Sequence, residues 1–441
     1  MAMALILALL VASILTGRPA SAATLQPLPA TVRVNVAGLG IFTSARFGST
    51  KTLVVTNNEV NEIYRGSGTV VVRAHVLRSK DGRWLLDRRE PATDPATRAA
   101  RLATLRDARV GEREGGESGI RVVGFEISVA SATDPIGTTL LAAPRPVLVT
   151  FTSPDGMVTF QQRPFVGRLE LALDDVEDLI AVNTVPTFDY LASAVGSEVP
   201  DSWHPEALAT QAIAARTYLA TRLKAHNAYD IEGDTRDQAY EGFDKVSNAT
   251  IRAVERTRGI VATYEGAPIE ALYSASAGGL TEDSEQVFGK EFPYLRSVPS
   301  PFDTAALNSS WGRTSWTWTK ELTASALGWQ LERKSLDVGE PLRIDLLEFS
   351  PTGRVTQARV VGTRATRYIN RDRSRYYFEL MSTLFTVTKS GDVFTFTGKG
   401  FGHGVGMSQW GMQGMALAGK TAREILAYYY RGIALTDTGG D

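Results

Sequence analysis

One glutamate stands where a carboxyl group could act as a catalytic acid. Glu198 lies directly before Val199-Pro200, a position that predicts a turn or the end of a helix. A carboxyl among Val195, Val199 and Trp203 would lose hydration, and desolvation favours the protonated form that a general acid needs. A capping or surface glutamate is the structural alternative, and the local sequence leaves both interpretations open.

Polar side chains on an alanine-rich helix form a second candidate group. The helical pattern begins at Pro205 and runs to about residue 224, with small and apolar residues at spacings of three and four. Gln211 and Arg216 would need partners if they are buried in it. Arg216 could orient a carboxylate such as Glu198 through a bidentate contact. An ion pair with no catalytic part would explain the arginine equally well.

Residues 273–281 form a third candidate group, rich in glycine and hydroxyl side chains. They include Ser274, Ser276 and the pair Gly278-Gly279. Paired glycines let a ligand approach backbone donors, and the hydroxyls could bind sugar oxygens. A tight turn between two strands would give the same composition, so both interpretations remain open.

The fourth group is residues 398–411, where glycine recurs at every second position around His403 and Gly404. The spacing fits neither a P-loop nor a dinucleotide-binding turn. It predicts a strand without side chains on one face, packed against another backbone or a substrate. His403 would then project from the opposite face, in either a structural or a functional role. Gln409 follows in the same segment.

Composition excludes several other kinds of chemistry. The chain has no cysteine, so thiolate zinc sites, thiol nucleophiles and disulfides are excluded. The four histidines, at positions 75, 204, 226 and 403, have no metal-ligand spacing, and no nucleophile elbow is present. Ser276 or Ser408 with His403 stays open as a hydrolase pair. The formal net charge of -1 disfavours a dedicated nucleic-acid binder.

The elements that would position these groups begin with a β-rich N-terminal domain, residues 23–160. Residues 31–75 include a run in which apolar and polar residues alternate, and they are dense in β-branched side chains. Residues 78–118 read as a charged, exposed insertion with a short helix at 95–109. Ser-Pro-Asp-Gly at 153–156 predicts a β-hairpin between its flanking apolar runs.

Residues 161–441 predict a second domain that carries all four candidate groups. A helix is expected at 246–258, and residues 259–275, 341–363 and 376–398 look β-rich, which predicts a sheet built from distant segments. Ser408 and a capping box at 421–424 predict two C-terminal helices separated at Gly419. The expected fold class is α+β, with mixed sheets, an alanine-rich active-site helix and C-terminal helices behind a smaller β-rich domain.

The first 22 residues predict export. An apolar run over residues 1–15 is followed by Ala20-Ser21-Ala22, which is typical of a secretory signal peptide with its cleavage site. The run is short for a membrane span, which needs roughly 20 apolar residues. No other segment of the sequence is expected to span a membrane. We therefore expect a secreted protein of the bacterial cell envelope.

Taken together, the motifs resemble those of the SpoIID/LytB family (stage II sporulation protein D and amidase-enhancer proteins) over about residues 160–435. The matching segments are residues 166–170, 182–183, 189–191, 197–200, 206–208, 211–212, 214–218, 234–240, 273–281, 293–298, 400–414 and 428–432. The resemblance implies a lytic transglycosylase that cleaves peptidoglycan between N-acetylmuramic acid and N-acetylglucosamine. Such an enzyme favours peptide-poor strands and leaves a 1,6-anhydro end, and the resemblance makes Glu198 the catalytic acid and base.

The resemblance also implies partners and positioning residues. Some family members bind zinc through a cysteine and a histidine before a Gln-x-Tyr motif, but residues 232–238 contain neither, so we expect no metal and no cofactor. The expected partners are glycan strands and possibly a cell-wall amidase, and a non-catalytic enhancer or wall-binding protein is the alternative function. Candidate substrate-positioning residues are Gln211, Arg216, Gln238, Tyr240, Ser274, Ser276, Gly278, Gly279, His403, Gly404 and Gln409.

Overall fold

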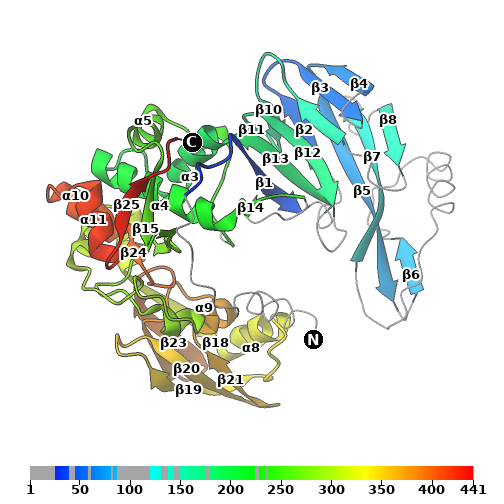
Figure 1. Cartoon of the computed structure of the whole chain (residues 1–441). Helices are drawn as coiled ribbons and strands as arrows, with labels where there is room; N and C mark the ends of the chain where they lie inside the picture. The colour runs from blue at the N-terminus through cyan, green and yellow to red at the C-terminus, as the bar shows by residue number, and fades with distance from the viewer. Residues whose placement is uncertain are drawn as a thin grey trace.

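A computed structural model gives the architecture of the chain (Figure 1). The described residues are 25–38, 45–57, 61–80, 83–86, 120–130, 138–143, 149–173, 179–223, 228–234 and 236–440. The expected signal peptide and the expected helix at 95–109 lie outside them, as does most of the charged insertion. Within the described residues, no helix is long and apolar enough to cross a membrane.

The N-terminal strands form two seven-stranded sheets (Figure 1). The first has the order β14-β1-β13-β12-β9-β3-β4. Its strands are β1 (Thr31–Gly38), β3 (Leu53–Asn57), β4 (Asn61–Gly66), β9 (Val149–Thr152), β12 (Arg168–Leu173), β13 (Leu179–Pro186) and β14 (Ile231–Glu232). The first sheet thus joins strands from both sides of residue 160, and the division of the chain at that residue stays a prediction.

The second sheet has the order β11-β10-β2-β5-β7-β8, with β6 paired to β5. Its strands are β2 (Ala45–Ser49), β5 (Thr69–Lys80), β6 (Arg83–Leu86), β7 (Ile120–Ala130), β8 (Thr138–Ala143), β10 (Val158–Phe160) and β11 (Arg163–Phe165). Phe47 of this sheet stacks on Phe151 of the first, with ring centroids 4.1 Å apart. Apolar faces of the two sheets therefore meet in one core.

The hairpin predicted at residues 153–156 is wrong. The turn exists, but β9 pairs with β3 and β12 in the first sheet, whereas β10 pairs with β2 and β11 in the second. Asp155 accepts hydrogen bonds from the backbone and side chain of Thr52, at 3.1 and 2.9 Å. The turn is therefore held by a neighbouring loop, and it carries the chain from one sheet to the other.

A group of helices packs around one central helix, and one member of the group, α3, lies beside β1 and β13 (Figure 1). The helices are α3 (Thr187–Glu198), α4 (Pro205–Arg222), α5 (Asn248–Arg256), α10 (Gln409–Leu417) and α11 (Ala422–Tyr429). The alanine-rich helix α4 is confirmed, but every residue from 207 to 219 is buried, so it is enclosed on all sides and does not show one apolar face. Its small side chains allow α3, α5, α10 and α11 to pack around it.

Short elements connect these helices. They are η1 (Phe243–Lys245), β15 (Ile260–Tyr264), β16 (Ala267–Pro268), β17 (Tyr273–Ser274), α6 (Ser284–Phe288), η2 (Pro301–Asn308), α7 (Ser310–Trp316), β24 (Met407–Ser408) and β25 (Ala434–Asp437). β15 pairs with β25, and β17 pairs with β24 in parallel, so distant segments do share sheets. The capping predictions are confirmed: Ser408 caps α10, Gly419 follows it at φ +83°, and Thr421 and Glu424 form the capping box of α11.

Residues 317–399 form a separate small lobe, drawn in yellow and orange in Figure 1. Its elements are β18 (Thr317–Thr323), α8 (Ala324–Arg333), β19 (Pro341–Phe349), β20 (Val355–Gly362), β21 (Thr366–Asn370), α9 (Arg373–Phe378), β22 (Phe385–Ser390) and β23 (Val393–Lys399). They make two three-stranded sheets, β18-β23-β22 and β19-β20-β21, around their own apolar core. The prediction that 259–275, 341–363 and 376–398 share a sheet is wrong. β19 and β20 form one sheet with β21, β22 and β23 form another with β18, and the strands within residues 260–274 belong to other sheets of the main body. The mixed sheets and helices confirm an α+β fold.

Candidate active site

Glu198 is the last residue of α3. The helix ends because Val199, which precedes a proline, is extended with φ -139° and ψ 151°. Gly196 lets another segment approach, because a Cβ there would lie 2.0 Å from the carbonyl oxygen of Lys245. The end of α3 is thereby fixed, and the prediction that Glu198 sits at a helix end is confirmed.

The carboxyl of Glu198 is held by three neutral hydrogen-bond donors. Oε1 accepts the backbone N–H of Ala239 at 3.0 Å, and Oε2 accepts Nε2 of Gln409 at 3.2 Å. The hydroxyl of Tyr273 is the third donor. Burial raises the pKa of Glu198, and the three donors oppose that rise. The site therefore favours a proton on Glu198 and also supports the carboxylate once the proton leaves.

Gln238 fixes the direction of the Tyr273 hydroxyl. Its Nε2 donates to the hydroxyl oxygen of Tyr273 at 3.2 Å and to the carbonyl of Ala215 at 3.3 Å. Its Oε1 accepts the hydroxyl of Tyr190 at 2.9 Å. Because the Tyr273 oxygen already accepts from Gln238, its proton can point at Glu198. Helices α3 and α4 thus hold the amide that aims the tyrosine.

The glycine segment, residues 400–406, is not the strand that its spacing predicts. Gly400, Gly402, Gly404 and Gly406 have φ values of 80°, 108°, 77° and 74°. Alternate positive φ angles interrupt an extended strand, and glycine is the residue that adopts them without strain. The predicted packing against another backbone is confirmed, because a Cβ on Gly406 would lie 2.1 Å from the carbonyl oxygen of Leu272.

His403 contacts the backbone of Tyr273. Its Nδ1 accepts the backbone N–H of Val405 at 3.0 Å, and its ring hydrogen-bonds the backbone carbonyl of Tyr273. Burial lowers the pKa of His403 to about 3, so the imidazole is neutral. Glu198 and His403 thus converge on the hydroxyl and the backbone carbonyl of the same tyrosine. Both of these described contacts of His403 are to backbone groups, which gives the ring a supporting position.

A cluster of hydroxyl groups surrounds a second buried carboxyl, Asp303. Its Oδ1 accepts Ser300 and Ser408, each at 2.6 Å, and its Oδ2 accepts Ser276 at 3.1 Å and the N–H of Gly279 at 3.4 Å. The hydroxyls of Ser276 and Ser408 therefore donate to a carboxylate. Since the described hydrogen bonds of His403 go to backbone groups, a serine–histidine hydrolase pair is not supported.

The other residues of the 273–281 segment shape its backbone. Gly278 and Gly279 have φ +72° and +100°, and a Cβ on Gly278 would meet the backbone of Gly400 at 3.1 Å. Ser274 is 7% exposed, and its hydroxyl has no hydrogen-bond partner among the described residues. Gly404 packs on Arg354, whose Nη2 would lie 2.4 Å from a Cβ there.

Three predicted positioning residues are enclosed in the main core. Arg216 donates to Thr257 and to the carbonyl of Val254, both at 3.3 Å, at the end of α5. Tyr240 donates to Asn183 at 2.6 Å. Gln211 is fully buried in α4, and its amide atoms have no hydrogen-bond partner in the described part of the chain. Arg216 and Tyr240 are thus engaged in structural contacts.

The segment where some relatives are expected to hold zinc is a network of ion pairs here. Arg236 pairs with Glu232 and Asp234, each at 2.9 Å, and Asp237 pairs with Arg222 at 3.4 Å. Within the described residues, no group of three or more histidine, aspartate or glutamate side chains could hold a metal ion. The charges of this segment are directed at each other.

The sequence alone did not single out Tyr273, Ala239 or Asp303. Tyr273 begins the hydroxyl-rich segment, and a large phenol beside small residues is a signal that could have marked it. Ala239 contributes only its backbone N–H, which no side-chain pattern reveals. Asp303 lies in η2, outside every motif, and apart from the neighbouring Ser300 its partners come from two distant segments, at Ser276 to Gly279 and at Ser408.

Two family models match parts of the chain. A family model described as stage II sporulation protein matches residues 175–264. A model described as a domain of unknown function (DUF8618) matches residues 304–406, which include the small lobe. An uncharacterized protein of Brachyspira hyodysenteriae is 34% identical over 294 residues, covering 66% of this chain and 76% of that protein.

Two relatives carry functional names. Stage II sporulation protein D of Bacillus subtilis is 31% identical over 280 residues, covering 58% of this chain and 76% of that protein. The amidase enhancer of Bacillus subtilis is 31% identical over 287 residues, covering 56% of this chain but 40% of that longer protein.

Proposed function

Because the chain belongs to the SpoIID/LytB family, we propose that it is an exported peptidoglycan lytic transglycosylase of the bacterial cell envelope, with Glu198 as catalytic acid and base. The family gives the chain a cell-wall-related function. The observation that supports the finer proposal is the carboxyl of Glu198, which is desolvated, half-buried and, within the described part of the chain, held by neutral donors. Such a group holds a proton more readily than an exposed glutamate and yields a stabilised anion.

The first step uses the proton of Glu198. The carboxyl donates it to the glycosidic oxygen, the bond from that oxygen to C1 of N-acetylmuramic acid breaks, and positive charge develops at C1. N-acetylglucosamine leaves with a free 4-hydroxyl. The carboxylate that remains is stabilised by the N–H of Ala239, the amide of Gln409 and the hydroxyl of Tyr273.

The second step regenerates the acid. The C6 hydroxyl of the same muramic acid attacks C1, and the Glu198 carboxylate takes the hydroxyl proton, which closes the 1,6-anhydro ring. Because the nucleophile belongs to the same sugar, no second carboxylate is needed to activate water. One residue that alternates between acid and base therefore accounts for the whole reaction.

The test is a digest of purified, peptide-free glycan strands with product analysis by mass spectrometry. Wild type should release fragments with 1,6-anhydro ends, and Glu198→Gln should lower that rate about 10³-fold or more. Glu255→Gln, at an exposed glutamate of α5, is the matched control and should retain full activity. Reducing ends from wild type would show hydrolysis and contradict the transglycosylase proposal.

The second candidate is a non-catalytic enhancer or wall-binding protein, which the similarity to a protein named amidase enhancer favours. It predicts no sugar release by wild type, unchanged wall binding by Glu198→Gln, and stimulation of an added cell-wall amidase. The same digest, repeated with amidase present, separates the two functions.

A further inference from the structure

The small lobe is joined to the main body through the glycine segment. The N–H of Gly400 donates to the carbonyl of Trp316 at 3.0 Å, and the indole of Trp318 donates back to the carbonyl of Gly400 at 2.9 Å. The N–H of Gly402 donates to the carbonyl of Met381 at 2.8 Å. The lobe therefore contacts the same backbone that packs against the Tyr273 strand.

Arg354 extends this contact from the turn between β19 and β20. It is 2% exposed, and its Nη2 donates to the carbonyls of Ala277 at 2.6 Å and Leu280 at 3.3 Å. Gly404 lies so close to the guanidinium that a side chain there would displace it. One arginine of the lobe thus touches both the 273–281 segment and the glycine segment.

Glu282 supplies the opposite charge at this junction. It is fully buried, and its Oε2 accepts the hydroxyls of Thr352 at 2.5 Å and of Ser350, both from the same turn as Arg354. Its backbone N–H donates to the carbonyl of Gly404 at 2.9 Å. An acidic residue of the main body, Glu282, therefore contacts the lobe, and a basic residue of the lobe, Arg354, contacts the main body.

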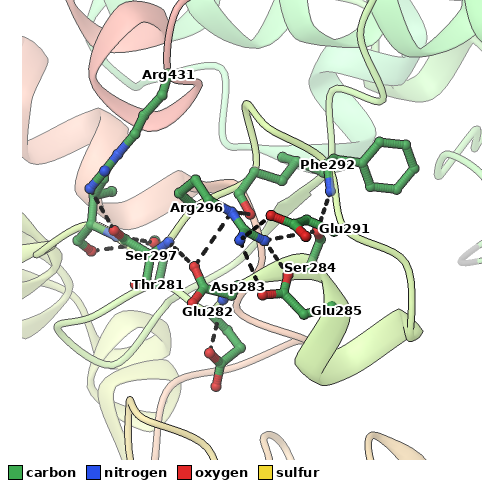
Figure 2. Close-up of polar contacts among 12 residues, drawn as sticks. Thr281, Glu282, Asp283, Ser284, Glu285, Glu291, Phe292, Arg296, Ser297 and Arg431 are labelled. Atoms are coloured by element: carbon green, nitrogen blue, oxygen red, sulfur yellow. Dashed lines mark hydrogen bonds and ion pairs between the residues drawn. The ribbon is translucent and has the colours of Figure 1, made fainter.

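Figure 2 shows how the main body holds the segment that carries Glu282. Arg296 lies among Asp283, Glu285 and Glu291, and it pairs with Asp283 at 3.7 Å and Glu291 at 3.3 Å. The N–H of Ser297 donates to Asp283 at 2.6 Å. Glu282 is thus presented to the lobe from a segment that ion pairs fix to its neighbours.

Stability alone does not account for the buried arginine. Nε and Nη1 of Arg354 are buried and have no hydrogen-bond partner among the described residues. A buried guanidinium with unsatisfied donors costs folding free energy, and an apolar side chain of similar volume often serves stability as well or better. A role that depends on its reach and directed donors explains the residue better.

A continuous set of contacts leads from Arg354 to the catalytic carboxyl. The guanidinium packs on Gly404, and the next residue back, His403, hydrogen-bonds the backbone carbonyl of Tyr273. The hydroxyl of Tyr273 then donates to Glu198. Displacing the arginine would move the backbone that supports the tyrosine.

We propose that the small lobe is part of the catalytic apparatus, and that Arg354 is a positioning residue that holds Tyr273 against Glu198 through the glycine segment. This inference rests on the proposed glycan-cleaving function. It gives the lobe, whose matching family model has no assigned function, a defined task in the reaction.

The kinetic test is a double-mutant cycle between Arg354→Met and Tyr273→Phe on peptide-free glycan strands. Arg354→Met should lower kcat about tenfold with little change in KM, as expected for a displaced donor, and Arg354→Lys should restore part of the loss. In the Tyr273→Phe background, Arg354→Met should cost no more than about twofold. Equal losses in both backgrounds would overturn the proposal, since coupling through Tyr273 would be absent.

A second measurement does not need activity. Hydrogen exchange followed by mass spectrometry should show faster exchange over residues 272–282 and 400–406 in Arg354→Met, and in Arg354→Lys if the methionine variant does not fold. The matched control is Arg359→Met, which removes an arginine that pairs with Asp345 within the lobe. Unchanged exchange would overturn the inference even if wild type cleaves glycan. Faster exchange with an inactive wild type would support the positioning contact and reject the proposed function.

Discussion

Glu198 and Asp303 are two desolvated carboxyls with pKa values shifted in the same direction, and we propose different tasks for them. Burial raises the pKa of each, and each is held by neutral donors that oppose the rise. Asp303 is fully buried, and each of its oxygens accepts two hydrogen bonds. Glu198 is half-buried. Desolvation therefore does not by itself make a carboxyl a catalytic acid, because the group must also be able to reach a proton acceptor on the substrate.

The comparison also explains why the two groups are near each other in the fold. Ser408 donates to Asp303 and caps α10, and the next residue, Gln409, donates to Glu198. Asp303, whose hydrogen bonds are all made, thus fixes the start of α10. The first residue of that helix, Gln409, supplies a donor to Glu198. We propose that Asp303 serves stability and that Glu198 serves the chemistry.

The largest effect that tests this assignment is on folding. Asp303→Asn replaces one acceptor oxygen with a donor that faces hydroxyl and N–H groups, so the free energy of unfolding should fall by about 2–3 kcal/mol. Urea unfolding measures this, with Asp201→Asn at an exposed aspartate as control. An unchanged free energy of unfolding, or an activity loss per folded molecule as large as that of Glu198→Gln, would remove the distinction.

A smaller effect is expected when the donor at Glu198 is removed. Tyr273→Phe should lower kcat about tenfold, because it deletes one hydrogen bond to the developing carboxylate. It should also raise the pKa of Glu198 further, since that donor lowers it, and so move the alkaline limb of the pH–rate profile to higher pH. Tyr376→Phe, at an exposed tyrosine of α9, is the control. An unmoved limb would mean that Tyr273 does not act on Glu198.

The smallest expected effect is on the pH dependence of stability. The pKa of Glu198 is raised above its ordinary value of 4.5, so between 4.5 and the raised pKa the folded state binds more protons than the unfolded state. Its contribution to stability is therefore present at low pH and is lost as pH rises through that window. Glu198→Gln removes this loss, so the variant should gain stability relative to wild type as pH rises. Parallel curves from urea unfolding at several pH values would show that the burial of Glu198 has no energetic consequence.

Local signals were sufficient for α4, α5, α10 and α11 and for part of the site, whereas the helices of the small lobe were not predicted. The caps at Ser408 and Thr421 were predicted correctly because the residues that form them lie within four positions of each other. Glu198 was recognised at a helix end before a proline, and Gln238 and Gln409 were among the expected positioning residues. Short-range sequence patterns report this kind of geometry directly.

What the sequence could not supply depends on long-range packing. The turn at 153–156 reads as a hairpin, because sequence does not reveal that its two strands join different sheets. The glycine segment reads as a strand, because spacing does not reveal positive φ angles. Arg216 reads as an orienting group, and only the structure directs it to the end of α5. The contact of Tyr273 with Glu198 joins residues far apart in the chain and has no local signature.

The attachment of the small lobe has a consequence for how such a protein can change. The chain leaves the main body at Trp316 and returns at Gly400, where the two residues are hydrogen-bonded to each other, and Thr317 pairs with Lys399 directly beyond them. The two ends of the lobe therefore lie side by side. A change in the length or identity of the segment between them places little constraint on the path of the rest of the chain. The fold can therefore accommodate a new accessory at this point without being rebuilt, and Arg354 is the residue through which this accessory contacts the 273–281 segment of the main body.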